Sequence, residues 1–171
     1  MICNLSAIIK DNSSELPVSG VCNLLDTDFL GEDISFPNGL YVDGKITNNT
    51  KSLQFTAKVT GEVNVHCARC RIPVSEKIEF SLSETLIRDE KQDSSMEDVI
   101  IFSGYEIDID EIVINNFFMN APVKYLCKED CKGLCPTCGQ DLNVGDCDCS
   151  DDEIDPRWAG LAQIIKNSQT E

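Results

Sequence analysis

The chain has 171 residues, of which 42% are hydrophobic, and carries 14 Lys plus Arg against 30 Asp plus Glu, for a formal net charge of −16. This length corresponds to one domain, or to one domain with an appended module. A surface that holds a phosphate backbone is usually basic. The charge therefore disfavours tight binding to RNA through a broad surface and favours a basic protein partner.

Nothing at the N-terminal end predicts export. The apolar stretch at residues 5–9 is too short for a signal peptide and has no basic segment before it. No apolar run approaches the length of a transmembrane helix. We therefore expect a cytoplasmic protein without membrane contact. In a reducing cytosol, the ten cysteines of the chain favour metal binding over disulfides.

Two long alternating segments dominate the first half of the chain. Apolar residues hold every second position from 53 to 65 and most such positions from 72 to 82, which is the period of half-buried β-strands. The two segments meet at residues 67–71, so Cys67 and Cys70 are predicted at the tip of a β-hairpin. Shorter strands are predicted at 2–9, 16–25 and 40–47.

A helix is predicted after this hairpin. Residues 89–98 are acidic, serine-rich and aperiodic, which indicates a solvated loop. Apolar residues then recur at helical spacing from Ile109 to Phe117. Either Asp108 or Asp110 can cap the helix, which is expected to end before Pro122. Short strands are predicted between the loop and the helix, at 99–102 and 105–107.

These elements predict an α+β fold. Residues 1–121 should form an antiparallel β-sheet, or a partly closed barrel, covered by one helix. Residues 122–171 should form a cysteine-rich, zinc-ribbon-like module and a C-terminal helix. That helix would begin at Asp155-Pro156, a favourable N-cap and first turn. Its apolar face would consist of Trp158, Leu161, Ala162 and Ile165.

The cysteine-rich segment has the spacing C-x3-C-x3-C-x2-C-x8-C-x-C. Large apolar side chains are almost absent between these cysteines, so a metal is the expected source of order. The candidate ligands are Cys127, Cys131, Cys135, Cys138, Cys147 and Cys149. Structural zinc takes four nitrogen or sulfur ligands in a tetrahedron, and thiolate-rich sites select soft or borderline ions. Zn²⁺ is therefore the predicted cofactor.

Cys135-Pro136-Thr137-Cys138-Gly139 reads as a zinc knuckle. Pro136 fixes the entry to the turn, and Gly139 can take the positive φ that follows the second ligand. The remaining two ligands come either from the upstream pair with x3 spacing, which fits the usual ligand spacing better, or from the downstream C-x-C pair. A disulfide knot would need an oxidising compartment. Redox cysteines would be expected in a strand–helix context that this motif lacks.

Cys67 and Cys70 are a further candidate metal pair. With the other six cysteines they would make two four-thiolate sites, although they could equally be a free pair at a hairpin tip. Arg69 and Arg71 beside them, together with Lys132, form a small basic spot and are the candidates for contact with a partner, including RNA phosphate. In the alternative interpretation these side chains compensate thiolate charge.

No catalytic constellation is visible. The chain has one histidine, no glycine-rich phosphate loop, and no set of nucleophile, base and orienting residue. We therefore predict a protein that is not an enzyme and has no small-molecule substrate.

Several segments resemble the family known as YceD or DUF177. They are C-K-G-L-C-P-T-C-G-Q-D-L-N, the following C-D-C, D-P-R-W-A-G-L, and Cys67-Ala68-Arg69-Cys70, so the resemblance covers mainly residues 60–166. It implies a role in accumulation of large-subunit (23S) ribosomal RNA. Together with the charge balance, it gives a large-subunit rRNA precursor or a basic ribosomal protein as the expected partner. It implies a process rather than a reaction. The cysteines alone leave an alternative, a zinc-ribbon protein-interaction module in transcription or metal handling.

Overall fold

The fold is taken from a computed structural model, which describes residues 1–149 except 12–13, 25–26, 30 and 89–98. The predicted acidic loop at 89–98 and the predicted C-terminal helix lie outside the described residues. The elements are β1 (Ile2–Asn4), α1 (Ser6–Ile9), β2 (Glu15–Cys22), β3 (Thr27–Phe29), β4 (Glu32–Ile34), β5 (Leu40–Asn48), β6 (Leu53–His66), β7 (Pro73–Arg88), β8 (Ile100–Phe102), β9 (Glu106–Asp108) and α2 (Ile109–Asn120).

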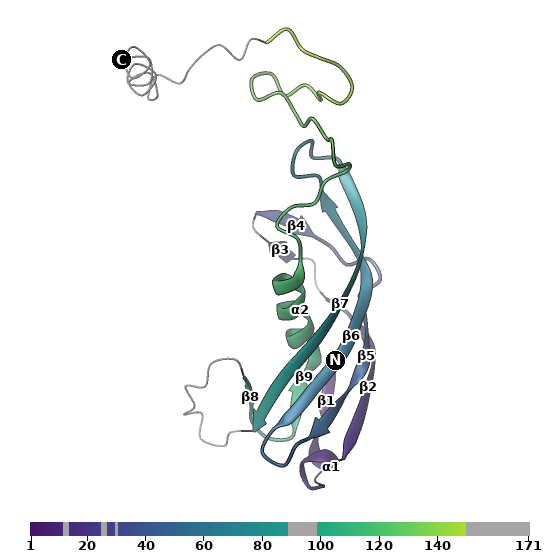
Figure 1. The fold of residues 1–171 in the computed structure, drawn as a ribbon, viewed down its shortest axis with the longest axis vertical. Helices are drawn as coiled ribbons and strands as arrows, with labels where there is room; N and C mark the ends of the chain where they lie inside the picture. The colour runs from purple at the N-terminus through teal and green to yellow at the C-terminus, as the bar shows by residue number, and fades with distance from the viewer. Residues whose placement is uncertain (12–13, 25–26, 30, 89–98, 150–171) are drawn as a thin grey trace, which may run out of the picture.

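A five-stranded sheet forms the body of the protein, with strand order β2-β5-β6-β7-β8 (Figure 1). Its centre is the predicted hairpin of β6 and β7, which are paired antiparallel from Leu53 and Leu86 to His66 and Pro73. The alternation predicted for β6 is confirmed, because its odd-numbered apolar residues from Leu53 to Val65 are buried. Strands β2 and β8 form the edges, and no ladder between them occurs among the described residues.

One edge of the sheet differs from the prediction. Strand β8 pairs with β7 in parallel, with Leu86 opposite Ile100, so the prediction of a wholly antiparallel sheet is wrong there. The strand has three residues, too few for a pattern that would reveal direction or partner. Strand β9 joins a separate two-stranded sheet with β1, and the strand predicted at 2–9 is interrupted by the single helical turn of α1.

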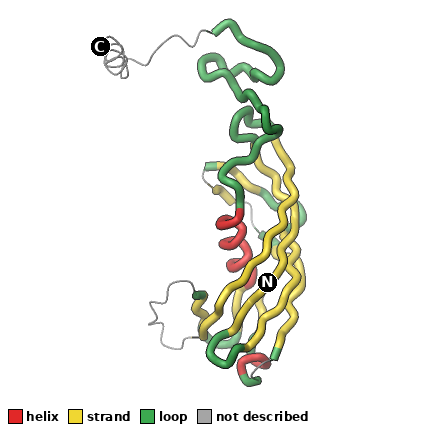
Figure 2. The backbone as a smooth tube through the Cα atoms, viewed as in Figure 1, coloured by secondary structure: helices red, strands yellow, loops and turns green. Residues whose placement is uncertain are grey.

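Helix α2 covers the concave face of the bent sheet (Figure 2). Asp108 is its N-cap, accepting a hydrogen bond from the backbone N–H of Asp110, and Ala121 ends it immediately before Pro122, as predicted. Its buried side includes Phe117, whose ring meets Phe36 edge-to-face at 5.1 Å between centroids. The core therefore lies between α2 and the β6–β7 hairpin, and Asn48 and Asn116 are the buried polar residues in the described part of the chain.

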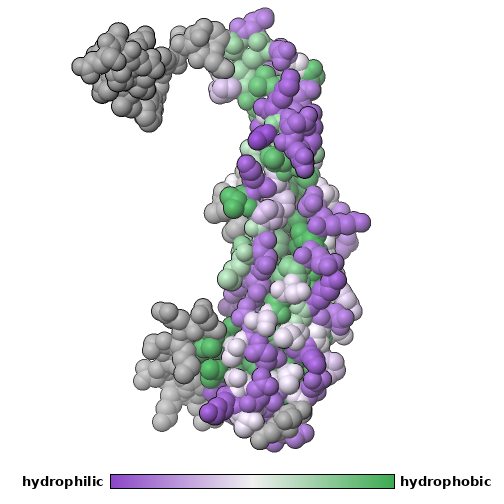
Figure 3. Space-filling model, in the orientation of Figure 1, coloured by the Kyte–Doolittle hydropathy of each residue, from purple (hydrophilic) through white to green (hydrophobic). Residues whose placement is uncertain are grey.

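The surface shows no broad apolar face in the view of Figure 3, where hydrophilic side chains are scattered over the whole length of the molecule. No helix among the described residues is long and apolar enough to cross a membrane. After α2, the chain from residue 122 to residue 149 runs up to the hairpin tip and continues beyond it along the long axis of the molecule, without regular helix or strand (Figure 1).

Candidate metal centre

Eight cysteines lie in two groups at the end of the molecule that carries the hairpin tip. In each group the four sulfur atoms all lie within 4.8 Å of one another, and no ion is present. The inner cluster consists of Cys67, Cys70, Cys127 and Cys131. The outer cluster consists of Cys135, Cys138, Cys147 and Cys149. Each cluster therefore has the number and kind of ligands that a structural zinc site uses.

The sulfur separations in the inner cluster fit a metal and not a disulfide. The Sγ atoms of Cys67 and Cys131 are 3.8 Å apart, and those of Cys70 and Cys127 are 3.6 Å apart. A disulfide would bring two sulfurs to about 2.05 Å. A tetrahedron with metal–sulfur bonds of about 2.3 Å has edges of about 3.8 Å. The observed distances match those edges.

The outer cluster begins with the predicted knuckle. Gly139 has φ +74°, as expected for the residue after the second ligand, and its N–H donates to the carbonyl of Cys135 at 2.9 Å. The N–H of Cys135 in turn donates to the carbonyl of Gln140 at 2.8 Å. These two bonds close a tight turn that aims both thiols of the C-x2-C motif at one point.

The turn at the hairpin tip has the same two backbone hydrogen bonds as the outer knuckle. The N–H of Arg71 donates to the carbonyl of Cys67 at 2.9 Å, and the N–H of Cys67 donates to the carbonyl of Ile72 at 2.8 Å. Arg71 occupies the position of Gly139 in the outer knuckle and has φ +63°. A non-glycine residue in this left-handed region costs of order 1–3 kcal/mol and persists only when the surroundings enforce it.

The strain at Arg71 leads to a stability prediction. Arg71→Gly and Arg71→Val both remove the arginine side chain, so the difference between them isolates the backbone. A β-branched residue is disfavoured at positive φ, whereas glycine is not. We expect the glycine variant to be more stable by about 1–2 kcal/mol in urea unfolding of the metal-loaded protein. The same pair at Arg69, where φ is not positive, should show no such advantage for glycine.

Backbone N–H groups favour the thiolate form of one cysteine in each of the two knuckles. In the outer knuckle, the N–H groups of Cys138 and Thr137 lower the pKa of the Cys135 thiol to about 6. At the hairpin tip, burial opposes ionisation of Cys67, but hydrogen bonds from the backbone of Cys70 and Cys127 lower its pKa to about 6. A lowered thiol pKa suits a metal ligand, because the thiolate is the form that binds.

Residues 125–134 wrap around the hairpin tip. The N–H of Ala68 donates to the carbonyl of Tyr125 at 2.9 Å, and the N–H of Leu134 donates to the carbonyl of Arg69 at 3.1 Å. Gly133 has φ +79°, and a Cβ there would lie 3.1 Å from the Arg69 carbonyl oxygen. The chain can therefore pass this close to the tip because position 133 is a glycine.

Asn143 links the outer loop to the inner cluster, and sequence reasoning missed it. Its side-chain amide donates to the Sγ of Cys131 at 3.4 Å, and its side-chain oxygen accepts from the N–H of Lys132 at 3.0 Å. It lies in the outer loop but contacts an inner ligand. An asparagine in a polar loop gives no signal in the sequence that would separate this role from that of a turn residue.

The structure groups the cysteines in a way that their spacing left open. Cys147 and Cys149 lie with Cys135 and Cys138, whereas the pair with the more usual x3 spacing, Cys127 and Cys131, lies with the hairpin tip. The inner cluster thus takes two cysteines from each side of the predicted boundary between residues 121 and 122, which itself stays a prediction.

The predicted partner-binding residues have contacts inside the protein. The guanidinium of Arg69 donates to the carbonyl of Cys131 at 2.6 Å, in a partly buried position. Lys132 lies 3.8 Å from Asp146 in an exposed ion pair. Arg71 adopts the positive φ described above. Contact of these three residues with a partner stays a prediction.

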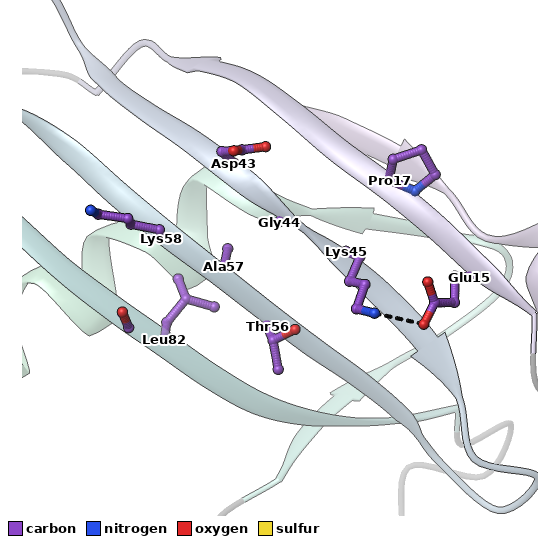
Figure 4. A pocket seen from close by; sticks show the side chains of 10 residues that line it. Glu15, Pro17, Asp43, Gly44, Lys45, Thr56, Ala57, Lys58 and Leu82 are labelled. Carbon is purple, nitrogen blue, oxygen red and sulfur yellow. Dashed lines mark hydrogen bonds and ion pairs between the residues drawn. The ribbon is translucent and has the colours of Figure 1, made fainter.

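A shallow hollow lies far from the cysteines, on the face of the sheet opposite α2 (Figure 4). Its polar lining includes Lys45 and Glu15, which form an ion pair at 2.6 Å, with Asp43 and Lys58 nearby. Lys58 also pairs with Glu79 at 2.9 Å. Because both lysines are already paired, the hollow offers no concentrated charge to a ligand.

Comparison with protein families gives a match to the family described as "Large ribosomal RNA subunit accumulation protein YceD" over residues 55–165. This region includes the long hairpin, α2 and both cysteine clusters. The search of solved structures gave no match.

Several curated proteins are similar to this chain. An uncharacterized protein of Mycobacterium tuberculosis is 30% identical over 145 residues, which is 83% of this chain and 62% of the relative. The Bacillus subtilis protein YlbN is 29% identical over 138 residues, covering 80% of each chain. An Arabidopsis thaliana protein, "Large ribosomal RNA subunit accumulation protein YCED homolog 1, chloroplastic", is 31% identical over 64 residues, covering 37% of this chain and 20% of its own length.

Proposed function

Because this chain belongs to the YceD family, we propose that it supports the accumulation of large-subunit ribosomal RNA, as a non-enzymatic factor in assembly of the large ribosomal subunit in the cytoplasm. The observation that carries the proposal is the family match over residues 55–165. That match covers nearly all of the β6–β7 hairpin, β8, α2 and both clusters, whereas β2 and β5 precede it, so the proposed role belongs to this larger part of the protein and not to a small motif within it.

The proposed contact is with a basic ribosomal protein or a protein-containing precursor particle. Residues 66–71 and 122–149 carry five Lys or Arg and five Asp or Glu, so the side chains around the clusters are balanced. A divalent ion with four thiolates adds a charge of −2. A loaded cluster therefore makes this end of the molecule negative, which favours a basic partner over phosphate.

In this proposal the outer cluster holds Zn²⁺. Four thiolates leave no open coordination position for a water or a substrate, so the ion would be structural. Cys138 is exposed and Cys147 and Cys149 are half-buried, so the ion would order a loop that lies at the surface of the molecule. The loop could then present its side chains to a partner in one conformation.

The test is capture of the tagged full chain from lysate, followed by sedimentation and identification of the bound RNA and proteins. We expect 23S precursor RNA and large-subunit proteins to co-sediment with the tagged chain. Depletion of the protein should lower 23S relative to 16S rRNA. The alternative interaction module predicts RNA polymerase, or metal-handling proteins, in place of precursor particles.

A matched variant tests whether the cysteine-bearing end makes the contact. Cys135→Ser with Cys138→Ser removes two ligands from the outer cluster, and Cys3→Ala removes a thiol far from both clusters. We expect the double variant to lose particle association and the Cys3 variant to keep it. Recovery of RNA polymerase without ribosomal particles would contradict the proposed function.

A further inference from the structure

The inner cluster joins parts of the chain that are distant in sequence. Cys70 and Cys127 are 57 residues apart, and Cys67 and Cys131 are 64 residues apart, yet their sulfurs are in contact. Three of the four are almost fully buried, with exposed fractions of 0% for Cys67, 5% for Cys70 and 1% for Cys131. The simplest explanation for buried cysteines is that they pack as small apolar residues.

Packing alone does not explain this arrangement. The knuckle at the hairpin tip has the same two backbone hydrogen bonds as the one in the outer cluster, although an arginine stands where the outer knuckle has glycine. Cysteines that only fill space need no knuckle backbone, and they need not bring four sulfur atoms within 4.8 Å of one another, which is the arrangement that a four-thiolate metal site requires.

Few other contacts hold the segment to the tip. In the described part of the chain, two backbone hydrogen bonds join them, from Ala68 to Tyr125 and from Leu134 to Arg69. The Arg69 side chain adds a third bond, to the carbonyl of Cys131. Apart from the cysteines, the apolar side chains that pack here among the described residues are Val74 and Leu126 at the inner cluster and Tyr125 at the edge of the main core, all only partly buried. This is too little apolar surface to fix ten residues of irregular chain, so a stronger link is needed.

We propose that the inner cluster binds a second soft or borderline divalent ion, Zn²⁺ by chemical class, and that this ion clamps residues 125–134 to the tip of the β6–β7 hairpin. Four protein thiolates complete its coordination, so the inner ion has no open position and acts on structure only. Because two of its ligands belong to the hairpin, it binds tightly only when the hairpin is formed. This inference does not depend on the proposed function.

The outer cluster differs from the inner one because its cysteines are close together in sequence. Its four ligands fall within residues 135–149, so it can form without the sheet. The two sites are therefore predicted to load separately, the outer one locally and the inner one as part of the tertiary structure. The inner ion would also fix the orientation of the outer loop relative to the sheet, through Asn143 and the shared turn at Lys132 and Gly133.

The experiment counts ions per chain by native mass spectrometry on reduced full-length protein loaded with Zn²⁺. We expect two ions in the unaltered protein and in Cys3→Ala. We expect one ion in Cys67→Ser with Cys70→Ser, and one in Cys135→Ser with Cys138→Ser. One ion in the unaltered protein, or two in the Cys67/Cys70 variant, would overturn the proposal.

Alkylation of the unaltered protein keeps the test valid if a variant fails to fold. In the Zn²⁺-loaded chain, iodoacetamide followed by peptide mapping should leave Cys67, Cys70, Cys127 and Cys131 unmodified. After removal of zinc by a chelator, Cys127 should become labelled, because it is the most exposed of the four. Equal labelling of Cys127 with and without zinc would contradict the inner site. Loss of ribosomal association with two ions retained would count against the proposed function alone.

Discussion

In hydrogen–deuterium exchange, Cys138→Ser is expected to expose the backbone of residues 134–149 while the β6–β7 hairpin keeps its protection. Little besides an ion can hold the outer loop, because Val144 is 87% exposed and Leu134 is 37% exposed. Structural zinc in zinc-finger peptides contributes about 10–16 kcal/mol of apparent binding free energy, and that energy is folding energy. Loss of one ligand of four removes a large share of it.

In Cys138→Ser, we expect the amides of Cys135 and Gly139 to exchange at least about 100-fold faster. This factor corresponds to a loss of about 2.8 kcal/mol in the free energy of local opening. These two N–H groups close the outer knuckle, so they report on it directly. The backbone of residues 127–131 should stay protected from exchange, because Cys127 and Cys131 belong to the inner cluster. Exchange that rises throughout 53–88 as well would contradict a local role for the outer ion.

The sequence predicted a wider effect for the same substitution. Six cysteines within 127–149 suggest one metal-dependent module, so loss of Cys138 would be expected to unfold all of it. The structure divides those cysteines between two clusters, one of which includes the two cysteines of the hairpin tip. Spacing rules relate ligands that are close in sequence. They give no information about cysteines such as Cys70 and Cys127, which are 57 residues apart.

The long elements could be predicted because their patterns are long. The alternation through β6 identified its buried face, and the period from Ile109 to Phe117 identified α2 together with its cap at Asp108. The three-residue strand β8 and the single turn of α1 contain too few residues for any period to appear. Their placement depends on tertiary pairing, which a local pattern does not encode.

The knuckle at the hairpin tip shows a second limit of prediction from the sequence. At the outer knuckle, glycine at position 139 predicted the positive φ that the structure has. At the inner knuckle the same position holds Arg71, and an arginine carries no signal for that conformation. The equivalence of the two turns is visible only in their hydrogen bonds, from Cys67 to Ile72 and from Cys135 to Gln140.

The affinity of the chain for RNA and for protein, and its dependence on salt, can identify the kind of partner. With a formal net charge of −16, the chain is expected to bind protein-free 23S fragments weakly and with little sequence preference. A protein that neutralises 6–10 phosphates loses about 10³–10⁵-fold in affinity between 50 and 200 mM salt. We expect a much flatter dependence here, together with affinity at least about 100-fold higher for a basic ribosomal protein or a precursor particle, which corresponds to about 2.8 kcal/mol.

Charge variants test which part of the surface steers this contact. Glu129→Gln, Asp130→Asn and Asp148→Asn together remove three negative charges beside the clusters. Rim charges act mainly on the association rate, so association with the basic partner should slow by about 10-fold while dissociation changes little. The matched control makes the same change in net charge at exposed positions outside the cysteine-bearing end, with Asp33→Asn, Asp43→Asn and Glu106→Gln.

Two results would move the functional surface elsewhere. Equal slowing by both triple variants would mean that net charge, and not the cysteine-bearing end, guides the encounter. Nanomolar binding to protein-free RNA at physiological salt would overturn the protein-contact proposal and direct attention to Arg69, Arg71 and Lys132. Of these, Arg69 already donates to the Cys131 carbonyl, so its use by phosphate would compete with the contact that holds the segment to the hairpin tip. RNA binding at Arg69 would then weaken the inner cluster, and zinc release on addition of RNA would reveal it.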